Sequence, residues 1–347
     1  MILQLVLVVT FYLRSLQLAE GYIDSSLQDF DCIHIYKQPA FQHPLLKHHK
    51  IQEKFSSNEN FSKKGKYKTN DQSCPKGTVP ILRQRNSTES VHLNTVGYPG
   101  QHFAVIETVL SRSIYRGAEA DISIHNLTVQ NNQYCKSQIW LENGSRNQLN
   151  SIQVGWAVHP RLYGYSSTRF TIYWTSDGYK KTGCYNTICP GFIIVSPNPS
   201  IGSIFSKSSI YGGETTVQFT PQIFQDGFTG NWALKVEDEI IGYWPKELFT
   251  HLKKGASLVR FGGNTFVYPD GFSPPMGNGY FPVINFQKSS SFVHVKIINS
   301  NYNRININHR RIKSYTDSKC FRVIYWGYSK TNGVAFSFGG PGGYCGI

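Results

Sequence analysis

A long series of short apolar runs, beginning near residue 102, constrains the fold of this chain most strongly. Each run is rich in β-branched and aromatic residues, several alternate between apolar and polar positions, and Gly, Asn, Pro or Asp separates neighbouring runs. The expected strands are 103–109, 120–124, 137–141, 169–174, 191–195, 215–219, 231–236, 291–297 and 334–338. Many short strands with turn residues between them predict an all-β fold, either a sandwich or an open barrel.

One helix is expected within this series, beginning at Pro245 and ending before Gly255. Proline is favoured in the first turn of a helix, and glycine is favoured directly after the last turn. Leu248, Phe249 and Leu252 would then share one face of the helix.

The first residues predict export from the cell. Residues 2–13 form an apolar run that is too short to span a bilayer, and small residues follow at Ala19 and Gly21. This pattern is typical of a signal peptide, here residues 1–21. We therefore expect a secreted protein, extracellular or in a cell wall, with no membrane attachment once the signal is removed. Four sequons for N-glycosylation fit this expectation and lie at Asn60, Asn86, Asn126 and Asn143.

The seven cysteines all follow the expected cleavage point, so in an oxidising compartment they should pair and leave one over. Spacing predicts the bridges Cys184–Cys189 and Cys320–Cys345, with Cys32–Cys74 as a further candidate. Cys135 would then be the odd thiol. No Cys or His spacing fits a metal site, so neither a metal nor a cofactor is expected.

The formal net charge of +14 raises the question of an anionic partner. Nucleic acid is a poor candidate, because no basic and aromatic module of the known types is present. An acidic wall polysaccharide is a better one, but general solubility of a basic secreted protein is the favoured explanation of the charge. A monomer is expected.

Five sequence blocks resemble the plant neprosin family. Residues 31–44 and 74–81 are similar to its activation peptide, and residues 150–156, 173–186 and 242–245 are similar to its catalytic domain. The resemblance implies a two-sheet antiparallel β-sandwich preceded by a removable pro-region, and it implies the disulfides at 184–189 and 320–345. Members with demonstrated activity are glutamic endopeptidases of acidic fluids that cleave at proline.

The resemblance and a change in composition near residue 90 together divide the chain. Residues 56–73 are rich in Lys, Asn and Ser with few apolar residues, which is typical of a linker. We expect a signal peptide at 1–21, an activation-peptide-like pro-region with a polar linker at 22–90, and a neprosin-like sandwich at 91–347.

The resemblance also places the family's two glutamates. The first position is Gln153, within an otherwise matching motif. The second motif, residues 277–286, carries Val283 and Ile284 at the glutamate positions and Tyr280 in place of a histidine. An acid peptidase without a metal or a Ser or Cys nucleophile needs a carboxylate base to activate water, and neither an amide nor an aliphatic side chain can accept the proton.

The sequence therefore favours an impaired homologue that keeps a peptide-binding cleft, with Gln153, Trp156 and Tyr280 as candidate cleft residues and a peptide or proline-rich protein as ligand. One alternative is an active acid prolyl endopeptidase with a rearranged dyad, which requires another carboxylate facing Gln153. The other is a wall-polysaccharide binder. The candidate replacement carboxylates are Glu107, Glu119, Asp121, Glu142, Asp177, Glu214, Glu237, Asp238 and Glu239.

Overall fold

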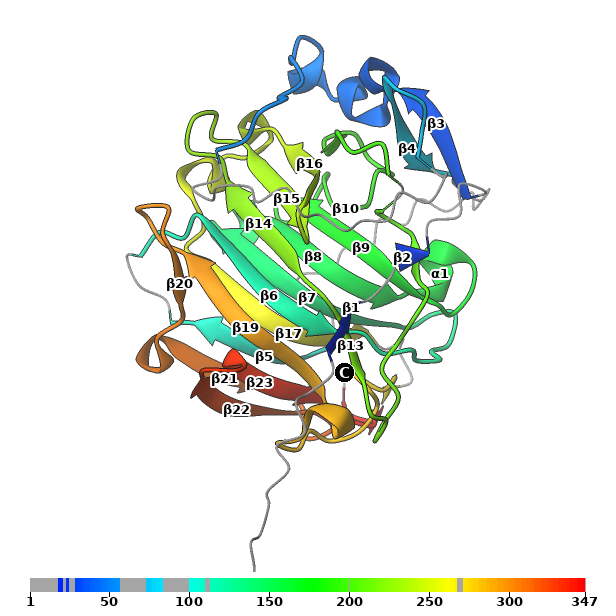
Figure 1. Cartoon of the computed structure of the whole chain (residues 1–347), viewed down its shortest axis with the longest axis vertical. Helices are drawn as coiled ribbons and strands as arrows, with labels where there is room; N and C mark the ends of the chain where they lie inside the picture. The colour runs from blue at the N-terminus through cyan, green and yellow to red at the C-terminus, as the bar shows by residue number, and fades with distance from the viewer. Residues whose placement is uncertain are drawn as a thin grey trace, which may run out of the picture.

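The computed structural model describes residues 18–20, 23–24, 29–56, 73–83, 100–109, 113–198, 200–266 and 271–346. The apolar run of the expected signal peptide and the sequons at Asn60 and Asn86 lie outside these residues. Within them, almost all regular structure is β-strand, and two large sheets account for most of it (Figure 1).

The larger sheet has eleven strands. Its main path runs in the order β11 (Ile193–Ile194), β16 (Glu239–Trp244), β15 (Trp232–Val236), β14 (Pro221–Gln225), β6 (Gly117–Ser123), β19 (Ser290–Ile298), β23 (Gly333–Gly339) and β22 (Arg322–Ser329). Three more strands pair off this path: β1 (Leu18–Glu20), β13 (Thr216–Phe219) and β20 (Arg304–Asn306). The pairings in this sheet are antiparallel except for β1 with β13.

The second sheet has nine strands. Its path runs in the order β2 (Ile23–Asp24), β12 (Ile204–Phe205), β9 (Thr168–Thr175), β8 (Asn150–Val158), β7 (Tyr134–Asn143), β17 (Leu258–Phe266), β5 (Gln101–Thr108) and β21 (Ile312–Thr316), with β10 (Cys184–Tyr185) beside β9. Two small ribbons pair β3 (Phe30–His34) with β4 (Thr78–Leu82) and β18 (Phe272–Ser273) with β24 (Gly343–Tyr344).

The hydrophobic core lies between the two large sheets. Along β8, the alternate residues Ile152, Val154 and Trp156 point into this core and are fully buried. Trp156 also donates a hydrogen bond of 2.9 Å from Nε1 to the carbonyl oxygen of Ser123 in β6, which ties the second sheet to the first. The expected all-β fold, a two-sheet antiparallel sandwich preceded by a pro-region, is confirmed.

Helical structure is limited to short segments. One four-residue helix, α1, spans Pro160–Tyr163. The 3-10 turns are η2 (Ile35–Lys37), η3 (Pro39–Gln42), η4 (Pro44–Leu46), η5 (Arg146–Gln148), η6 (Lys246–Leu248), η7 (Leu252–Lys254), η8 (Phe286–Lys288) and η9 (His309–Arg311). Among the described residues, no helix is long and apolar enough to cross a membrane.

The expected continuous helix from Pro245 to Gly255 is wrong. The segment forms two separate 3-10 turns, η6 and η7, and Phe249 between them is extended, with φ −113° and ψ 136°. The side chain of Asn150 explains the break, because its Oδ1 accepts from the backbone N–H groups of His251 and Leu252. These two donors are thereby satisfied without a continuous helix.

The cysteines pair as the spacing suggested. Bridges join Cys32 to Cys74, Cys184 to Cys189 and Cys320 to Cys345, and Cys135 is left free and buried. Burial raises the pKa of the Cys135 thiol to about 12, so this thiol is uncharged at any physiological pH.

The described part of the pro-region lies against the larger sheet at β11 and β16. Gln38 makes a reciprocal pair of hydrogen bonds with the backbone of Ile194, and its side chain is almost fully buried. Further along, the backbone N–H and the hydroxyl of Ser56 both donate to one carboxylate oxygen of Asp226. The pro-region is therefore held on the sandwich by specific polar contacts at both places.

Candidate functional site

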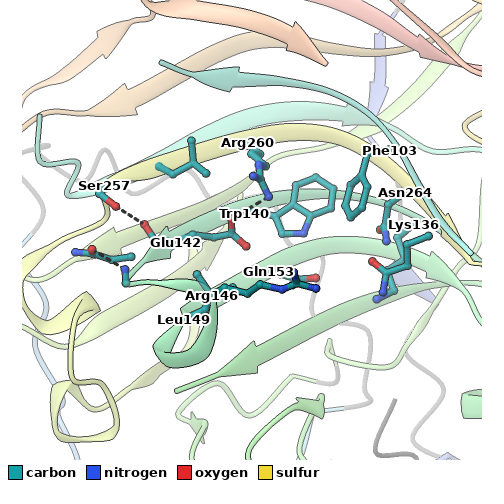
Figure 2. A pocket seen from close by; sticks show the side chains of 14 residues that line it. Phe103, Lys136, Trp140, Glu142, Arg146, Leu149, Gln153, Ser257, Arg260 and Asn264 are labelled. Atoms are coloured by element: carbon teal, nitrogen blue, oxygen red, sulfur yellow. Dashed lines mark hydrogen bonds and ion pairs between the residues drawn. The ribbon is translucent and has the colours of Figure 1, made fainter. Parts of the chain in front are cut away.

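A pocket of about 330 Å³ opens on the outer face of the nine-stranded sheet (Figure 2). Side chains from β5, β7, β8 and β17 form its floor, because alternate residues of these strands point away from the core. The lining residues that carry polar or aromatic chemistry are Gln101, Phe103, Lys136, Trp140, Glu142, Asn143, Arg146, Gln153, Ser257, Arg260 and Asn264.

Gln153 lies in the middle of β8 and faces this pocket. Its register partners are Trp140 on β7 and Tyr173 on β9. The amide Nε2 donates to Tyr179 Oη at 2.6 Å and lies 3.4 Å from Ser151 Oγ. Burial raises the pKa of Tyr179 well above its ordinary value, so the phenol stays protonated. Gln153 is thus held in one orientation by neutral neighbours.

Among the described residues that line the pocket, Glu142 is the one carboxylate. Its Oε1 accepts from Ser151 Oγ at 3.2 Å, and its Oε2 lies 3.0 Å from an Arg260 guanidinium nitrogen. Arg260 also bonds Glu107 at 2.6 Å. Burial alone would lower the pKa of Arg260, but the two carboxylates more than offset this and raise it. Glu142 is therefore part of an ionic cluster with Arg260 and Glu107.

Asn264 occupies the other end of the pocket, on β17. It pairs in register with Lys136 on β7 and with Phe103 on β5. Its side chain is almost fully buried, and its Oδ1 has no hydrogen-bond partner among the described residues. Gln153 and Asn264 lie on the strands on either side of β7, but Gln153 is in register with Trp140 and Asn264 with Lys136, so the two amides lie at different points along the pocket.

The backbones of β7 and β8 approach closely at Gly155. A Cβ added at Gly155 would lie 1.9 Å from the carbonyl oxygen of Ser137, so only glycine fits at this position of β8. Its neighbour across the pair is Gln138, whose side chain is fully buried. Neither the Oε1 nor the Nε2 of Gln138 has a hydrogen-bond partner among the described residues.

Lys136 is a buried cation beside this pocket. Its Nζ lies 4.3 Å from the ring centroid of Tyr134, 4.6 Å from that of Tyr185 and 4.9 Å from that of Tyr173. Only 1% of the residue is exposed, and no ion pair joins it to a described acidic residue. Burial lowers the pKa of the Lys136 ammonium to about 7.

The structure does not bring the expected cleft residues together. Trp156 is fully buried and bonded to Ser123, so it belongs to the core. Tyr280 is 51% exposed and packs on Tyr211, with ring centroids 4.1 Å apart, outside the pocket. Of the three candidates, only Gln153 lines the pocket. The interpretation of Trp156 and Tyr280 as cleft residues is therefore corrected.

Val283 and Ile284 are also absent from this pocket. They precede η8, and 44% and 72% of these residues, respectively, are exposed. The family's second glutamate position therefore does not lie in the pocket that holds Gln153. Asn264 does line this pocket, but the sequence alone did not single it out, because it follows two glycines in a segment that lacks the usual alternation of a strand.

Two of the four sequons fall among the described residues, and a buried histidine, His159, lies near the pocket residue Lys136. The sequon residue Asn126 is exposed, whereas Asn143 is half-buried and donates from Nδ2 to the carbonyl oxygen of Gly255 at 2.7 Å. His159 precedes α1 as its N-cap and is buried. Burial lowers the pKa of His159 well below its ordinary value, and the nearby Lys136 adds to the effect.

Comparison with known families supports this picture of the domain. The neprosin family matches residues 131–341, and the neprosin activation peptide matches residues 23–98. The chain belongs to the neprosin family. The neprosin match includes the pocket strands β7, β8 and β17, and the activation-peptide match includes the segment from Gln38 to Ser56 that lies on β11 and β16.

Several solved structures are similar to parts of this chain at low sequence identity. Scytalido-glutamic peptidase with a peptide-based transition-state analogue is 9% identical, with a TM-score of 0.36 over 69% of this chain and 97% of that chain. SCP-B, a member of the eqolisin family of peptidases in complex with the tripeptide Ala-Ile-His, is 9% identical, with a TM-score of 0.34 over the same shares. CG-16, a homodimeric agglutinin from chicken liver, is 8% identical, with a TM-score of 0.25 over 48% of this chain and 96% of that chain.

Proposed function

We propose that this chain is a secreted neprosin-family protein that binds peptide in the Gln153 pocket without hydrolysing it. The observation that carries the proposal is the content of the pocket, where the first glutamate position of the family holds the amide Gln153 and the one carboxylate among the described lining residues, Glu142, is in an ion pair with Arg260. An amide can donate a hydrogen bond to a peptide carbonyl or accept one from a peptide N–H. It cannot take a proton from water.

The state of Glu142 supports the same conclusion. A general base must hold its water within hydrogen-bond distance and have a free lone pair for the proton. Both oxygens of Glu142 are already engaged, one by Ser151 and the other by Arg260. A water molecule would have to bind at the remaining lone pairs of these oxygens, beside the Ser151 and Arg260 contacts, before Glu142 could act.

Trp140 gives the pocket an aromatic side chain that a bound peptide can contact. It is the register partner of both Gln153 and Arg260, so its side chain lies between a hydrogen-bonding amide and a guanidinium (Figure 2). An aromatic surface beside polar groups is the usual composition of a site that binds peptide side chains. Proline rings pack well on such a surface, which supports a proline-containing ligand.

A second candidate function follows from one specific contact. Ser151 Oγ joins Gln153 Nε2 to Glu142 Oε1, so a carboxylate lies one hydroxyl away from the amide. If a peptide displaced Ser151 and a water molecule entered, Glu142 could act as base and Gln153 could donate to the oxyanion. Glu142 and Gln153 would then form the rearranged dyad of an active acid endopeptidase.

One experiment separates the two functions. Purified protein is incubated at pH 2–6 with proline-containing hexapeptides, cleavage is followed by mass spectrometry, and binding is measured by isothermal titration calorimetry. Binding without cleavage is the expected result. Cleavage that disappears in Glu142→Gln but persists in the exposed control Glu214→Gln would replace the proposal by the active enzyme.

A further inference from the structure

A group of buried polar atoms without partners surrounds Lys136. Tyr185 Oη, both ring nitrogens of His159 and Asn264 Oδ1 make no hydrogen bond with any described residue. The ring of His159 lies 5.3 Å from that of Tyr185 and 5.2 Å from that of Tyr134, and both tyrosine rings contact Lys136 Nζ. Buried polar groups are nearly always hydrogen-bonded in a complete structure. Of these residues, Asn264 lines the pocket together with Lys136, so a group bound in the pocket can reach both.

The charge of Lys136 decides which group fits. Burying an ammonium ion is costly, and contacts with aromatic rings return only part of that cost. The tyrosine rings thus offset only part of the cost, and the described residues offer no carboxylate to Lys136. A ligand that brings an anion into the pocket would supply the missing partner.

The acceptors beside Lys136 narrow the choice further. Asn264 Oδ1 is an unpartnered acceptor on the strand next to Lys136. A group that satisfies both residues must present an anion and an N–H or O–H donor close together. The last residue of a peptide does this, because its carboxylate and its amide N–H are attached to the same carbon.

We propose that Lys136 anchors the C-terminal carboxylate of a peptide, and that Asn264 accepts from the N–H of the same residue. The inference rests on the proposed function, since it names the part of the peptide that the pocket takes. Peptide ends then bind in preference to the interior of a chain. Gln153 and Trp140 contact the residues that precede the end.

The test compares two ligands that differ only at the terminus. Proline-containing hexapeptides with a free C-terminal carboxylate or a C-terminal carboxamide are titrated into the protein by calorimetry at pH 6. We expect the carboxylate form to bind about tenfold more tightly or better, since hydrogen bonds to charged groups are worth about 1.5–3 kcal/mol. The ratio should fall to about one in Lys136→Met and stay unchanged in the exposed control Lys207→Met.

Each outcome has one meaning. Equal affinity of the two peptides for the wild-type protein overturns the anchor but leaves peptide binding intact. No binding of either peptide overturns the proposed function itself. A ratio that persists in Lys136→Met places the anchor elsewhere, and tighter binding of galacturonic acid than of the peptide carboxylate assigns the subsite to acidic sugar. The wild-type comparison needs no variant, so a folding defect in Lys136→Met does not remove the test.

Discussion

Gln153 and Tyr179 are joined by a hydrogen bond of 2.6 Å between the amide Nε2 and the phenol Oη. Both side chains are buried, so neither group can exchange this bond for one to water without a local rearrangement. The contact fixes which part of the amide remains available to the pocket. It also makes Tyr179 the neighbour on which the geometry of the site depends most directly.

Removal of the Tyr179 hydroxyl should destabilise the protein. In Tyr179→Phe the Gln153 amide loses its short acceptor, and we expect the free energy of unfolding to fall by about 1–3 kcal/mol. Tyr185→Phe is the matched control, because Tyr185 Oη has no described partner and its loss should cost less. Urea denaturation of both variants measures the difference. Equal losses would show that the Gln153–Tyr179 bond contributes nothing specific.

Two carboxylates in place of the two amides should create hydrolytic chemistry. In the double variant Gln153→Glu with Asn264→Glu, the pocket would hold one further acid on each side of β7, and an ionised one could take a proton from a water molecule bound between them. We expect cleavage of proline-containing peptides at acid pH by the double variant. Each single variant should stay at the wild-type level, since losing a base or its partner costs about 10²–10⁴-fold.

This experiment also checks the geometry of the pocket. An inactive double variant that still binds peptide would mean that residues 153 and 264 do not face one water molecule. Activity in Gln153→Glu alone would instead identify Glu142 as the second acid, because Glu142 is already linked to residue 153 through Ser151.

The sandwich could be predicted from the sequence because its strands carry local signals. Strands such as β9 and β19 are rich in β-branched and aromatic residues, and such runs indicate strands. The site was harder to predict, since β8 and β17 contain Gly155, Gly262 and Gly263, which weaken the strand pattern. Close backbone packing requires glycine there, and local patterns do not reveal such packing.

The second position of the site could not be found by motif matching. Residues 277–286 match a family motif by their glycines and aromatics, yet Val283 and Ile284 project to solvent. Asn264 reaches the pocket only because β17 pairs with β7 over nine residues, so that it lies beside Lys136. Asn264 and Lys136 are 128 residues apart in the sequence, so their pairing depends on the register of the whole sheet. The buried Lys136 was missed for the same reason.

The pro-region contact at Asp226 should depend on pH. Burial alone would raise the pKa of Asp226, but hydrogen bonds from Ser56 and Thr229 outweigh it and hold the pKa below the ordinary value of 3.8. A carboxyl group with a lowered pKa in the folded state stabilises the contact above 3.8, and the effect is lost as the pH falls through the lowered value. We expect an acid protease to cleave the segment ending at Ser56 faster once the pH falls below the lowered pKa of Asp226.

Asp226→Asn should reproduce that loss at neutral pH. The amide oxygen still accepts a hydrogen bond, but the charge-assisted pair with Ser56 is gone, so limited proteolysis near Ser56 should accelerate several-fold. Asp238→Asn is the control, because Asp238 is largely exposed and pairs only with Lys235 nearby. Equal cleavage rates in Asp226→Asn and the wild type would mean that other contacts hold the segment.

Peptide affinity should fall as the pH rises through neutrality. Burial lowers the pKa of Lys136 to about 7, so in the free protein its positive charge is present below this pH and lost above it. A peptide carboxylate stays ionised throughout, and its pairing with the ammonium would shift the midpoint upward.

The other titratable groups around Lys136 do not change charge in the same range. His159 stays neutral because burial lowers its pKa, and Tyr134 and Tyr185 stay neutral because burial raises theirs. Glu142 and Arg260, at the other end of the pocket, are held as an ion pair. Calorimetry of the carboxylate peptide from pH 6 to pH 9 should therefore show weakening with proton uptake on binding. Lys136→Met should remove both effects, and a pH dependence that survives in this variant would have to come from another group.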